Sequence, residues 1–414
     1  MRIAVIGAGI AGMYCAYKLS RDHHVSVFDK NPYIGGHTAT KDVEVASGRY
    51  AIDTGFIVCN DKTYPNFLRL MDELHIALKP TEMSFAVSCN ETGLEYNGHD
   101  LNTLFAQRKN IFSPKFWLFL KEILRFNKLA KQQLREQVLN EQTTLGEFLQ
   151  QHRFSGWVVS HYLAPMTAAI WSTPLTDVMN FPLAFFLQFC DNHGLLNIQD
   201  RPQWFVLHGG SRSYVKALMA SCNAEFFADS GVVRVSRNND DVVLQLGNGQ
   251  LLHFDKVIFA CHSDEALALL SDASREEQQI LGAIPYAESE VVLHTDTRLL
   301  PENRLAHAAW NYLLTGENKR PTLTYSMNIL QGFTAPETFC VTLNRSDAIE
   351  PEKVLGRYLY SHPQFSKQAV IAQKRHGEIS GSRHSYYCGA YWFNGFHEDG
   401  VVSAIRVIDQ LGKS

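Results

Sequence analysis

The sequence lacks closely spaced cysteines, a uniformly apolar segment of membrane-spanning length and an excess of either charge. Its eight cysteines form no CxxC pair, which argues against zinc ribbons, thioredoxin-like redox motifs and a metal site. With 38 Lys and Arg against 42 Asp and Glu, the net charge of −4 is far from the strongly basic balance of a protein that binds nucleic acid over its whole surface. The least charged stretch, residues 154–176, contains Ser, His and Pro, unlike a membrane-spanning helix.

The chain is long and rich in apolar residues. Its 414 residues, 45% of them hydrophobic, are enough for about two domains with their own cores. The 25 Phe, 16 Tyr and 6 Trp are sufficient to line a large apolar pocket as well as to fill those cores. No secretory leader precedes the first apolar run at residues 2–6, so we expect a cytoplasmic protein.

The N-terminus carries the strongest motif. Residues 2–6 are a β-branched run typical of a buried parallel strand, and they lead directly into Gly7-Ala8-Gly9-Ile10-Ala11-Gly12, a G-x-G-x-x-G pattern. In dinucleotide-binding folds the first glycine permits a tight turn, the second lets a pyrophosphate approach the backbone, and the third allows close helix–strand packing. We therefore predict that Gly7, Gly9 and Gly12, with the backbone of Ile10 and Ala11, bind phosphates at a helix N-terminus.

A second predicted strand ends in an acidic residue. Residues 24–28 alternate like a strand and stop at Asp29, 22 residues after Gly7. An acid at this position accepts hydrogen bonds from the ribose hydroxyls of adenosine, and we include the neighbouring Lys30 in the predicted contact. An acid in place of Arg or Lys argues against a nucleotide with a 2′-phosphate.

The segment after Asp29 distinguishes FAD from NAD. Residues 31–38 read Asn-Pro-Tyr-Ile-Gly-Gly-His-Thr, and this glycine pair resembles that of the flavin amine oxidase and phytoene desaturase superfamily. The resemblance implies that FAD pyrophosphate is held by Gly35, Gly36, His37 and Thr38. Residues 51–56 are similar to the superfamily segment that reaches the flavin ring, which implies contacts from Asp53, Thr54 and Gly55 and places Phe56 beside the substrate.

Later segments resemble the remaining cofactor contacts of that superfamily. Residues 386–392 resemble its last strand and turn, and residues 395–401 resemble the start of its final helix, whose N–H groups point at the flavin. Residues 231–235 resemble the strand that lies against adenine. The implied cofactor contacts are Val233, Ala260, Gly389, Asp399, Gly400 and Val401.

A narrower resemblance covers essentially the whole chain. Residues 53–58, 161–172, 192–196, 209–214, 310–312 and 395–400 resemble a bacterial NAD/FAD-binding oxidoreductase subfamily. That subfamily is similar to the N-terminal flavin-oxidase-like domain of plant cyclopropane fatty acid synthases. The resemblance implies a lipid or fatty acyl substrate, oxidised or dehydrogenated by hydride transfer to flavin.

Two departures from the superfamily pattern argue against amine oxidation. His37 stands where many flavin amine oxidases have Arg, and residues 281–297 contain no Lys that could lie near flavin N5. A flavin amine oxidase is the alternative enzyme. A non-catalytic, flavin-bearing accessory protein that binds a lipid-modifying enzyme is the alternative from another class.

The fold class is therefore α/β, with a glutathione-reductase-type, Rossmann-like FAD-binding domain and an α+β substrate domain like that of amine oxidases. We assign residues 1–78, 205–270 and 376–414 to the FAD-binding domain, and residues 79–204 and 271–375 to the substrate domain, with a mixed or antiparallel sheet. Residues 83–89 and 94–97 predict a hairpin, and helices are expected near residues 113–137, 144–152 and 178–190.

Because FAD carries the redox chemistry, no acid–base triad is required, and the pattern identifies no catalytic residue. Glu398 is either a proton donor or a helix-start carboxylate. Cys388 is expected to be a small buried residue, not a covalent flavin attachment, so we predict non-covalent FAD. Aromatic residues that either line the substrate pocket or fill cores are Trp171, Trp310, Tyr391, Trp392 and His397.

Residues 108–135 hold eight Lys or Arg and a single acid, Glu122. Apolar residues recur there near a helical period, with Trp117 among the added aromatics. Two interpretations remain open: an ordinary amphipathic helix with a solvated basic face, or a helix that lies on an anionic membrane surface, which would make the protein peripheral to the membrane.

Overall fold

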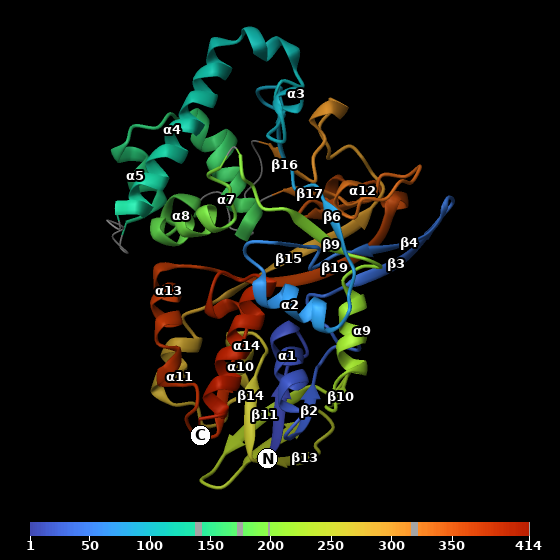
Figure 1. Cartoon of the computed structure of the whole chain (residues 1–414), viewed down its shortest axis with the longest axis vertical. Helices are drawn as coiled ribbons and strands as arrows, with labels where there is room; N and C mark the ends of the chain where they lie inside the picture. The colour runs from blue at the N-terminus through green and yellow to red at the C-terminus, as the bar shows by residue number, and fades with distance from the viewer. Residues whose placement is uncertain (137–142, 172–176, 198, 316–321, 414) are drawn as a thin grey trace.

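A computed structural model describes residues 1–136, 143–171, 177–197, 199–315 and 322–413. Its lower half contains a five-stranded sheet in the order β10-β2-β1-β14-β20, in which every neighbouring pair is parallel (Figure 1). The strands come from three distant stretches of the chain. They are β1 (Arg2–Ile6), β2 (His24–Phe28), β10 (Glu225–Phe227), β14 (Lys256–Phe259) and β20 (Ser385–Tyr387).

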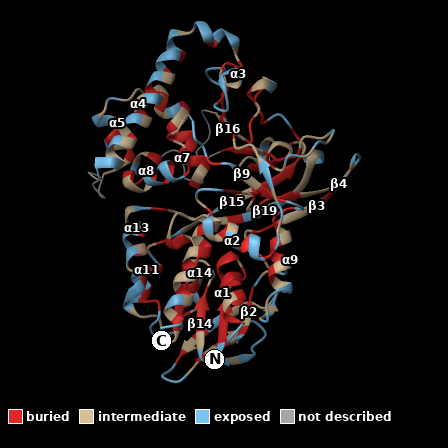
Figure 2. Ribbon diagram, in the orientation of Figure 1, coloured by how far each residue is buried: buried red, intermediate tan, exposed pale blue. Residues whose placement is uncertain are grey.

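The parallel sheet is covered on both faces, as the apolar runs in its strands require (Figure 2). One face packs against helices, and its core includes Val5 and Val27. The helices there are α1 (Ile10–Leu19), α2 (Pro65–Glu73), α9 (Arg212–Ala220) and α14 (His397–Leu411).

The other face of the parallel sheet packs against a small antiparallel sheet and three helices, around Phe28 and Val257. These elements are β11 (Val232–Arg237), β12 (Val242–Leu246), β13 (Leu251–Phe254), α10 (Ser263–Leu269), α11 (Arg275–Leu281) and α13 (Lys367–Lys374).

The upper half contains a seven-stranded mixed sheet in the order β19-β15-β18-β17-β16-β7-β8. Only β16 and β7 pair in parallel, and β7 and β8 form the hairpin that the sequence predicts. The mixed sheet of an amine-oxidase-like substrate domain is thereby confirmed. Its strands are β7 (Phe85–Cys89), β8 (Leu94–Asn97), β15 (Tyr286–His294), β16 (Trp310–Leu314), β17 (Leu323–Ser326), β18 (Cys340–Leu343) and β19 (Val354–Pro363).

Helices cover one end of the upper sheet and share a core rich in Phe. They are α3 (Leu101–Leu104), α4 (Pro114–Glu136), α5 (Leu145–Gln151), α6 (Gly156–Val158), α7 (Ala164–Trp171) and α8 (Leu183–Asn192), with a π-helical turn at Val159–Leu163. The remaining elements are β3 (Thr40–Val45), β4 (Gly48–Asp53), β5 (Val58–Asn60), β6 (Leu78–Thr81), β9 (Trp204–Leu207) and α12 (Met327–Leu330).

A buried ion pair links the small antiparallel sheet and its helices to the parallel sheet. The Arg237 guanidinium on β11 donates to Glu277 Oε2 at 2.8 Å, and the Tyr387 hydroxyl on β20 donates to Glu277 Oε1 at 2.6 Å. Both charged side chains are almost fully buried. Although burial opposes ionisation, the hydrogen bonds from Arg237 and Tyr387 hold the pKa of Glu277 at about 2.

Arg237→Met should therefore destabilise the protein strongly, because it removes the nearer cationic partner of the buried Glu277 carboxylate and leaves only Arg383, 4.0 Å away. We expect a loss of about 3–5 kcal/mol in the free energy of unfolding, measured by urea titration. Arg49→Met is the matched control, since Arg49 pairs with Glu44 at the surface and its loss should cost under about 1 kcal/mol. Equal losses in the two variants would contradict this account of the network.

Candidate functional site

Several predicted cofactor segments converge at the carboxyl ends of β1 and β14. Figure 1 shows the N-termini of α1 and α14 directed from this edge toward the upper sheet. In open α/β sheets, ligands bind at the carboxyl ends of the parallel strands, where helix N-termini offer free N–H groups. The candidate site is therefore the region where the lower and upper halves of the molecule meet.

Three glycines shape the turn between β1 and α1. Gly7 has a φ of +103°, and a Cβ there would lie 2.8 Å from the backbone of Ala260. A Cβ on Gly12 would lie 2.0 Å from the Gly7 carbonyl oxygen, so this position tolerates only glycine. A Cβ on Gly9, by contrast, would meet nothing within 4 Å. The open space above Gly9 is what a bound pyrophosphate requires.

The Asp29 carboxylate, at the end of β2, stabilises this turn. It accepts hydrogen bonds from the backbone N–H groups of Ala8 and Asn31, each at 2.8 Å. The adjacent Lys30 side chain is used elsewhere, because it pairs with Glu265 of α10 at 2.5 Å. Of these two predicted residues, Asp29 is thus the one whose side chain lies at the glycine turn.

The second glycine turn packs on the first. Gly35 N–H donates to the Ala8 carbonyl at 3.0 Å, and a Cβ on Gly36 would lie 2.9 Å from the Gly9 Cα. A Cβ on Gly55 would lie 2.0 Å from the His37 carbonyl oxygen. Gly36 and Gly55 are therefore glycines because their backbone lies against the backbone of Gly9 and His37 respectively.

Asp53 and Thr54 hold neighbouring elements in place. The buried Asp53 carboxylate accepts hydrogen bonds from the backbone N–H and the hydroxyl of Ser211, at 3.0 and 2.8 Å, next to α9. The Thr54 hydroxyl donates to the Ala39 carbonyl and also bonds the Tyr360 hydroxyl at 2.8 Å. A cofactor contact from Asp53 would have to come from its backbone or from carboxylate lone pairs that these hydrogen bonds leave free.

A cluster of rings surrounds His37. Its ring centroid lies 5.4 Å from those of Tyr360 and His362 and 6.1 Å from that of His262. Burial and the neighbouring histidines lower the pKa of His37 to about 3, and burial lowers that of His362 to about 4. His37 Nε2 and His362 Nδ1 are buried without a hydrogen-bond partner. Unpaired nitrogens next to the glycine pair fit a polar ligand better than a sealed core.

The last predicted cofactor segment is held by contacts around the start of α14. Gly389 N–H donates to the Ser403 hydroxyl at 2.8 Å, and a Cβ on Gly400 would lie 2.7 Å from Ile10 Cγ2. The Asp399 carboxylate accepts from the Phe396 N–H at 2.8 Å, and burial raises the pKa of Asp399 to about 7. Val401 is fully buried against α1.

Phe56 and His397 lie face to face. Their ring centroids are 3.7 Å apart at an interplanar angle of 9°, and His397 Nε2 lies 2.7 Å from the Tyr214 hydroxyl. Tyr214 in turn bonds the Thr38 hydroxyl at 2.6 Å, which links α9 and α14 to the second glycine turn.

Glu398 has a structural role. Its carboxylate accepts hydrogen bonds from the backbone N–H groups of Asn66 and Phe67, at 3.0 and 2.8 Å, and therefore caps the N-terminus of α2. Both carboxylate oxygens of Glu398 are thus engaged by α2, a contact that the sequence did not indicate.

The other predicted aromatic pocket residues are spread over different cores. Tyr391 and Trp392 pack together at 5.0 Å in the core beneath the parallel sheet. Trp171 packs among Phe residues of the upper helices, and Trp310 lies against Tyr325 in the upper sheet. Phe56 and His397 thus stack on each other near the glycine turns, whereas Tyr391 and Trp392 pack on each other in a different core.

The adenine-side segment is placed close to Asp29. Ser230 N–H donates to the Asp29 carbonyl at 2.8 Å, just before β11 begins. Val233 lies at a register irregularity in β11 and is 53% exposed. Ala260, at the end of β14, donates its N–H to the Ile6 carbonyl and lies under the first glycine turn.

Sequence reasoning missed His262, Tyr360, His362 and the hydroxyl of Tyr214. His362 and Tyr360 come from β19, more than 300 residues after His37, and carry no local motif. His262 stands two residues after the end of the predicted strand 254–260, so its position after a strand that enters the site was an available signal.

The family follows from a comparison with known sequences. A family model described as "Flavin containing amine oxidoreductase" matches residues 10–337. The chain belongs to this family. A flavin cofactor and an oxidoreductase activity come with the membership. No curated protein sequence matches the chain.

Solved structures show the same fold at low identity. The chain is similar to the CLA-producing fatty acid isomerase from P. acnes, with a TM-score of 0.70 and 15% identity over 99% of this chain and 98% of that chain. It is also similar to putrescine oxidase bound to putrescine, with a TM-score of 0.68 and 12% identity over 100% of both chains. Cyclohexylamine oxidase from Brevibacterium oxydans IH-35A gives a TM-score of 0.67 and 15% identity over 99% of both chains. These likenesses confirm the α/β amine-oxidase fold.

The residues present fit the flavin that the family implies. The first turn leaves open space above Gly9, and the second leaves an unpaired buried nitrogen on His37. Two helices, α1 and α14, direct their N-termini to the same region (Figure 1). These features suit an anionic, polar group that spans from the glycine turns to the start of α14.

Proposed function

We propose that this protein binds FAD non-covalently and oxidises or dehydrogenates an apolar substrate, a lipid or fatty acyl chain, by hydride transfer to flavin. FAD supplies the two-electron chemistry when it is bound. The tasks left to the chain are binding, orientation and exclusion of water. Under this proposal Gly7, Gly9, Asp29, Gly35 and the start of α14 hold the cofactor, and Phe56 with His397 forms an apolar wall beside it.

The observation that carries the substrate class is an aromatic cluster above the start of α14. Phe396 stacks on Phe189 at 4.9 Å, and Phe189 lies 4.6 Å from Trp171. Phe185 lies 5.1 Å from Phe365 in the same region. Phe189 and Trp171 are buried, whereas Phe185 and Phe396 are partly exposed, and partly exposed aromatic side chains of this kind suit an acyl chain. The fold shared with a fatty acid isomerase and the resemblance to the plant synthase domain support the same substrate class.

The strand β15 argues against amine oxidation. It runs over Tyr286–His294 and carries Glu288 and Glu290 but no Lys. Amine oxidases with this fold share the architecture, and putrescine oxidase is one by its name. The missing Lys and the His at position 37 distinguish this chain from the superfamily pattern.

The division into domains belongs to the same proposal. Residues 1–78, 205–270 and 376–414 would bind the cofactor, and residues 79–204 and 271–375 would bind substrate. Helices α11 and α13, although they belong to the second set, pack on the core of the parallel sheet through Ile280, Leu281 and Ala369. They would connect the two parts.

An anaerobic substrate screen tests the proposal. The flavin absorbance near 450 nm should bleach with an acyl lipid and persist with putrescine or cyclohexylamine. Bleaching by an amine but by no acyl lipid would replace the proposal with a flavin amine oxidase. Full flavin occupancy without bleaching by either class would favour the accessory protein, in which the flavin does not turn over.

The non-covalent link can be tested at Cys388. Its thiol is fully buried, 4.0 Å from the Cys15 sulfur, and the hydrogen bond with Cys15 together with burial raises its pKa well above the usual value. A neutral buried thiol is a poor nucleophile. Cys388→Ala should therefore keep the flavin content of the wild type, measured as the ratio of flavin to protein absorbance. If flavin stayed with the acid-precipitated wild type but not with acid-precipitated Cys388→Ala, the flavin would be covalently bound at Cys388.

A further inference from the structure

The segment from α3 to the middle of α4 exposes an unusual amount of apolar surface. Of the thirteen exposed large hydrophobic side chains in the described part of the chain, six lie between residues 101 and 124. We call five of them the apolar tip: Leu101, Ile111, Phe112, Trp117 and Leu118. Phe112 is 86% exposed and Leu101 is 75% exposed, which is rare for side chains of this size in a soluble protein.

The apolar tip is held rigidly. Arg108 donates to the Phe105 carbonyl at 2.8 Å and to Asn102 Oδ1 at 2.6 Å, which fixes the 3₁₀ turn at Arg108–Phe112. The Trp117 indole N–H donates to the Ile111 carbonyl at 2.8 Å. Preorganised apolar groups lose little conformational entropy when they bind, so this tip is suited to insertion into another phase.

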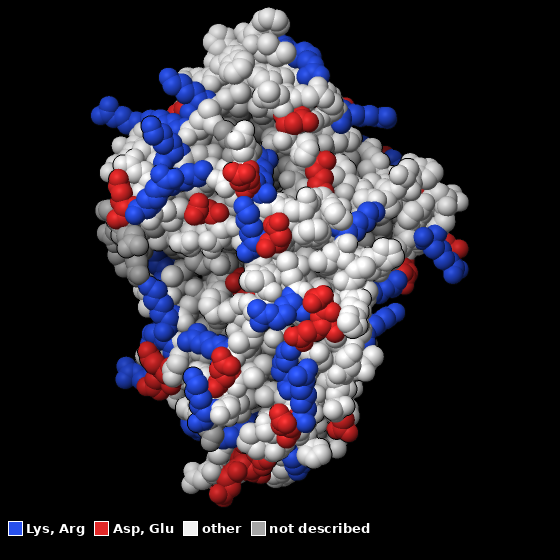
Figure 3. Space-filling model, in the orientation of Figure 1, with Lys and Arg blue, Asp and Glu red and all other residues white. Residues whose placement is uncertain are grey.

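Basic residues surround the tip and continue along α4. Lys109 is exposed at the tip, and Lys121, Lys128, Lys131 and Arg135 follow Trp117 on one side of α4, at the i+4, i+11, i+14 and i+18 positions. We call these four residues the basic stripe. In Figure 3 the top of the molecule, around α3 and the first turns of α4, is mainly white, and Lys and Arg side chains lie below it.

No opposite charge neutralises this surface from within its own segment. Glu122 is the only acid between residues 101 and 135, and it is buried, where it accepts from Ser155 N–H at 3.0 Å and lies near Arg125. Lys115 lies over the Trp157 ring at 3.3 Å and is already engaged. The exposed charge of the tip and the basic stripe is therefore positive.

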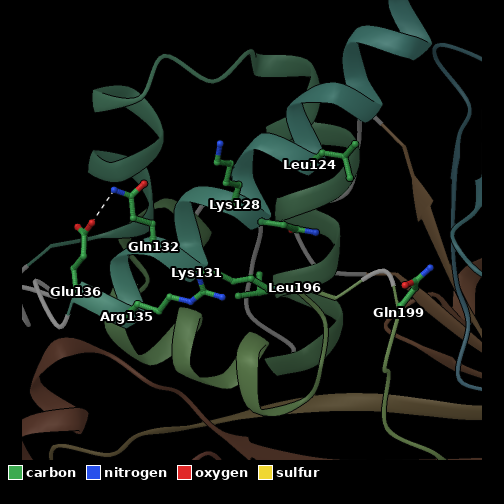
Figure 4. Close-up of a pocket in the computed structure, with 9 residues that line it drawn as sticks. Leu124, Lys128, Lys131, Gln132, Arg135, Glu136, Leu196 and Gln199 are labelled. Carbon is green, nitrogen blue, oxygen red and sulfur yellow. Dashed lines mark hydrogen bonds between the residues drawn. The ribbon is translucent and has the colours of Figure 1, made fainter.

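The far half of the basic stripe borders a cavity of about 750 Å³. The cavity is lined by Lys128, Lys131 and Arg135 of α4 together with Leu196 and Gln199, and Figure 4 shows Leu196 beside Lys131. Glu136, also at its margin, is hydrogen-bonded to Gln132. Cationic side chains around a hollow of this size fit an anionic headgroup.

We propose that the apolar tip and the basic stripe form a docking surface for an anionic lipid bilayer. The tip inserts its apolar side chains into the interface, and the stripe lies over the anionic headgroups. The buried face of α4, through Phe116, Phe119 and Phe126, packs on the core, so the helix keeps its position when the outer face binds. Among the described residues, no helix is both long and apolar enough to cross a bilayer.

A flotation assay with the flavin-loaded full chain tests the proposal. The probes are vesicles of phosphatidylcholine alone and of phosphatidylcholine with about 30% phosphatidylglycerol, a fraction chosen to approximate an anionic leaflet. Wild type should float with the anionic vesicles and remain behind with the neutral ones, and salt should weaken binding. Phe112→Ser should lower the partition coefficient roughly tenfold, and Lys109→Glu and Lys121→Glu about fivefold or more each.

Matched controls come from the lower half of the molecule. Leu251→Ser removes an apolar side chain that is 59% exposed, and Lys413→Glu reverses an exposed charge, so neither should change flotation. Wild-type protein that ignores anionic vesicles at low salt would overturn the proposal. Normal flotation of Phe112→Ser would also overturn it. So would a wild type that binds no vesicles but forms an oligomer that Phe112→Ser loses in light scattering, because the tip would then be a protein interface. None of these outcomes depends on the substrate proposed above.

Discussion

A Gly9→Val variant is expected to fold normally and to lose its flavin. Gly9 has φ −71° and ψ 179°, a backbone conformation that Val adopts readily, and a Cβ there meets nothing within 4 Å. The added side chain would occupy the space in which the pyrophosphate approaches the N–H groups of the turn. Loss of two charge-assisted hydrogen bonds, at about 1.5–3 kcal/mol each, weakens binding at least about a hundredfold.

The measurement is paired: thermal unfolding of the flavin-free protein and titration with FAD, followed by flavin fluorescence. Gly9→Val should keep the wild-type unfolding curve to within about 0.5 kcal/mol and fail to bind FAD. Gly156→Val is the matched control, since a Cβ on Gly156 also meets nothing within 4 Å but lies at the start of α6. A Gly9→Val protein with normal FAD affinity would show that the cofactor does not approach this turn.

Gly12→Val should give a different result from Gly9→Val. Its Cβ would lie 2.0 Å from the Gly7 carbonyl oxygen, so the packing of α1 on β1 could not form. We expect this variant to be insoluble or unfolded. The contrast between the two glycines separates a binding role from a folding role at neighbouring positions.

The second large expected effect is loss of stability in mild acid. His193, His294 and His376 are at most 8% exposed, and burial lowers the pKa of each to about 4. They are neutral in the folded protein, whereas in the unfolded chain they take up protons below about pH 6.5. The unfolded state therefore binds more protons, and stability falls as pH drops from 6.5 toward 4.

The expected size is several kcal/mol. One pKa unit corresponds to about 1.4 kcal/mol, so each of the three histidines costs roughly 2 kcal/mol at pH 5. Asp399 acts in the opposite direction, because its pKa of about 7 lies above the unfolded value and its stabilising protonation grows as pH falls through 7. The histidines outnumber it, so urea unfolding at pH 7.5 and pH 5 should show a net loss at pH 5.

A single substitution separates this effect from general acid unfolding. His294→Gln removes one titrating group while Gln can still bond Thr342, whose hydroxyl lies 2.7 Å from His294 Nε2. The slope of unfolding free energy against pH, between pH 6 and 5, should fall by close to one proton. An unchanged slope in His294→Gln would contradict the neutral state of the buried ring.

Local motifs allowed the lower sheet to be predicted closely. The strand, glycine turn, helix and second strand at residues 2–28 appear as β1, α1 and β2, because each step follows from short-range sequence. The hairpin of β7 and β8 was predicted for the same reason. The helix expected from residue 178 begins instead at Leu183, since Pro182 disfavours helical backbone in the residue before it.

Partners brought together from distant segments could not be predicted. Asp53 and Glu398 stand in segments that resemble cofactor motifs, yet their carboxylates accept hydrogen bonds from Ser211 and Phe67 respectively. A motif gives the position of a residue on its own segment. It does not reveal which N–H group from another element reaches that residue. The ring cluster around His37 has the same origin, because β19 supplies two of its members.

The central claim is that this chain holds a flavin, specifically non-covalent FAD. The most direct measurement is the visible absorbance spectrum of the purified, desalted protein, followed by identification of what acid precipitation releases. We predict two flavin bands and free FAD in the supernatant. A colourless protein that also takes up no added FAD would contradict the account, and it would leave the two glycine turns as a dinucleotide-binding fold without its cofactor.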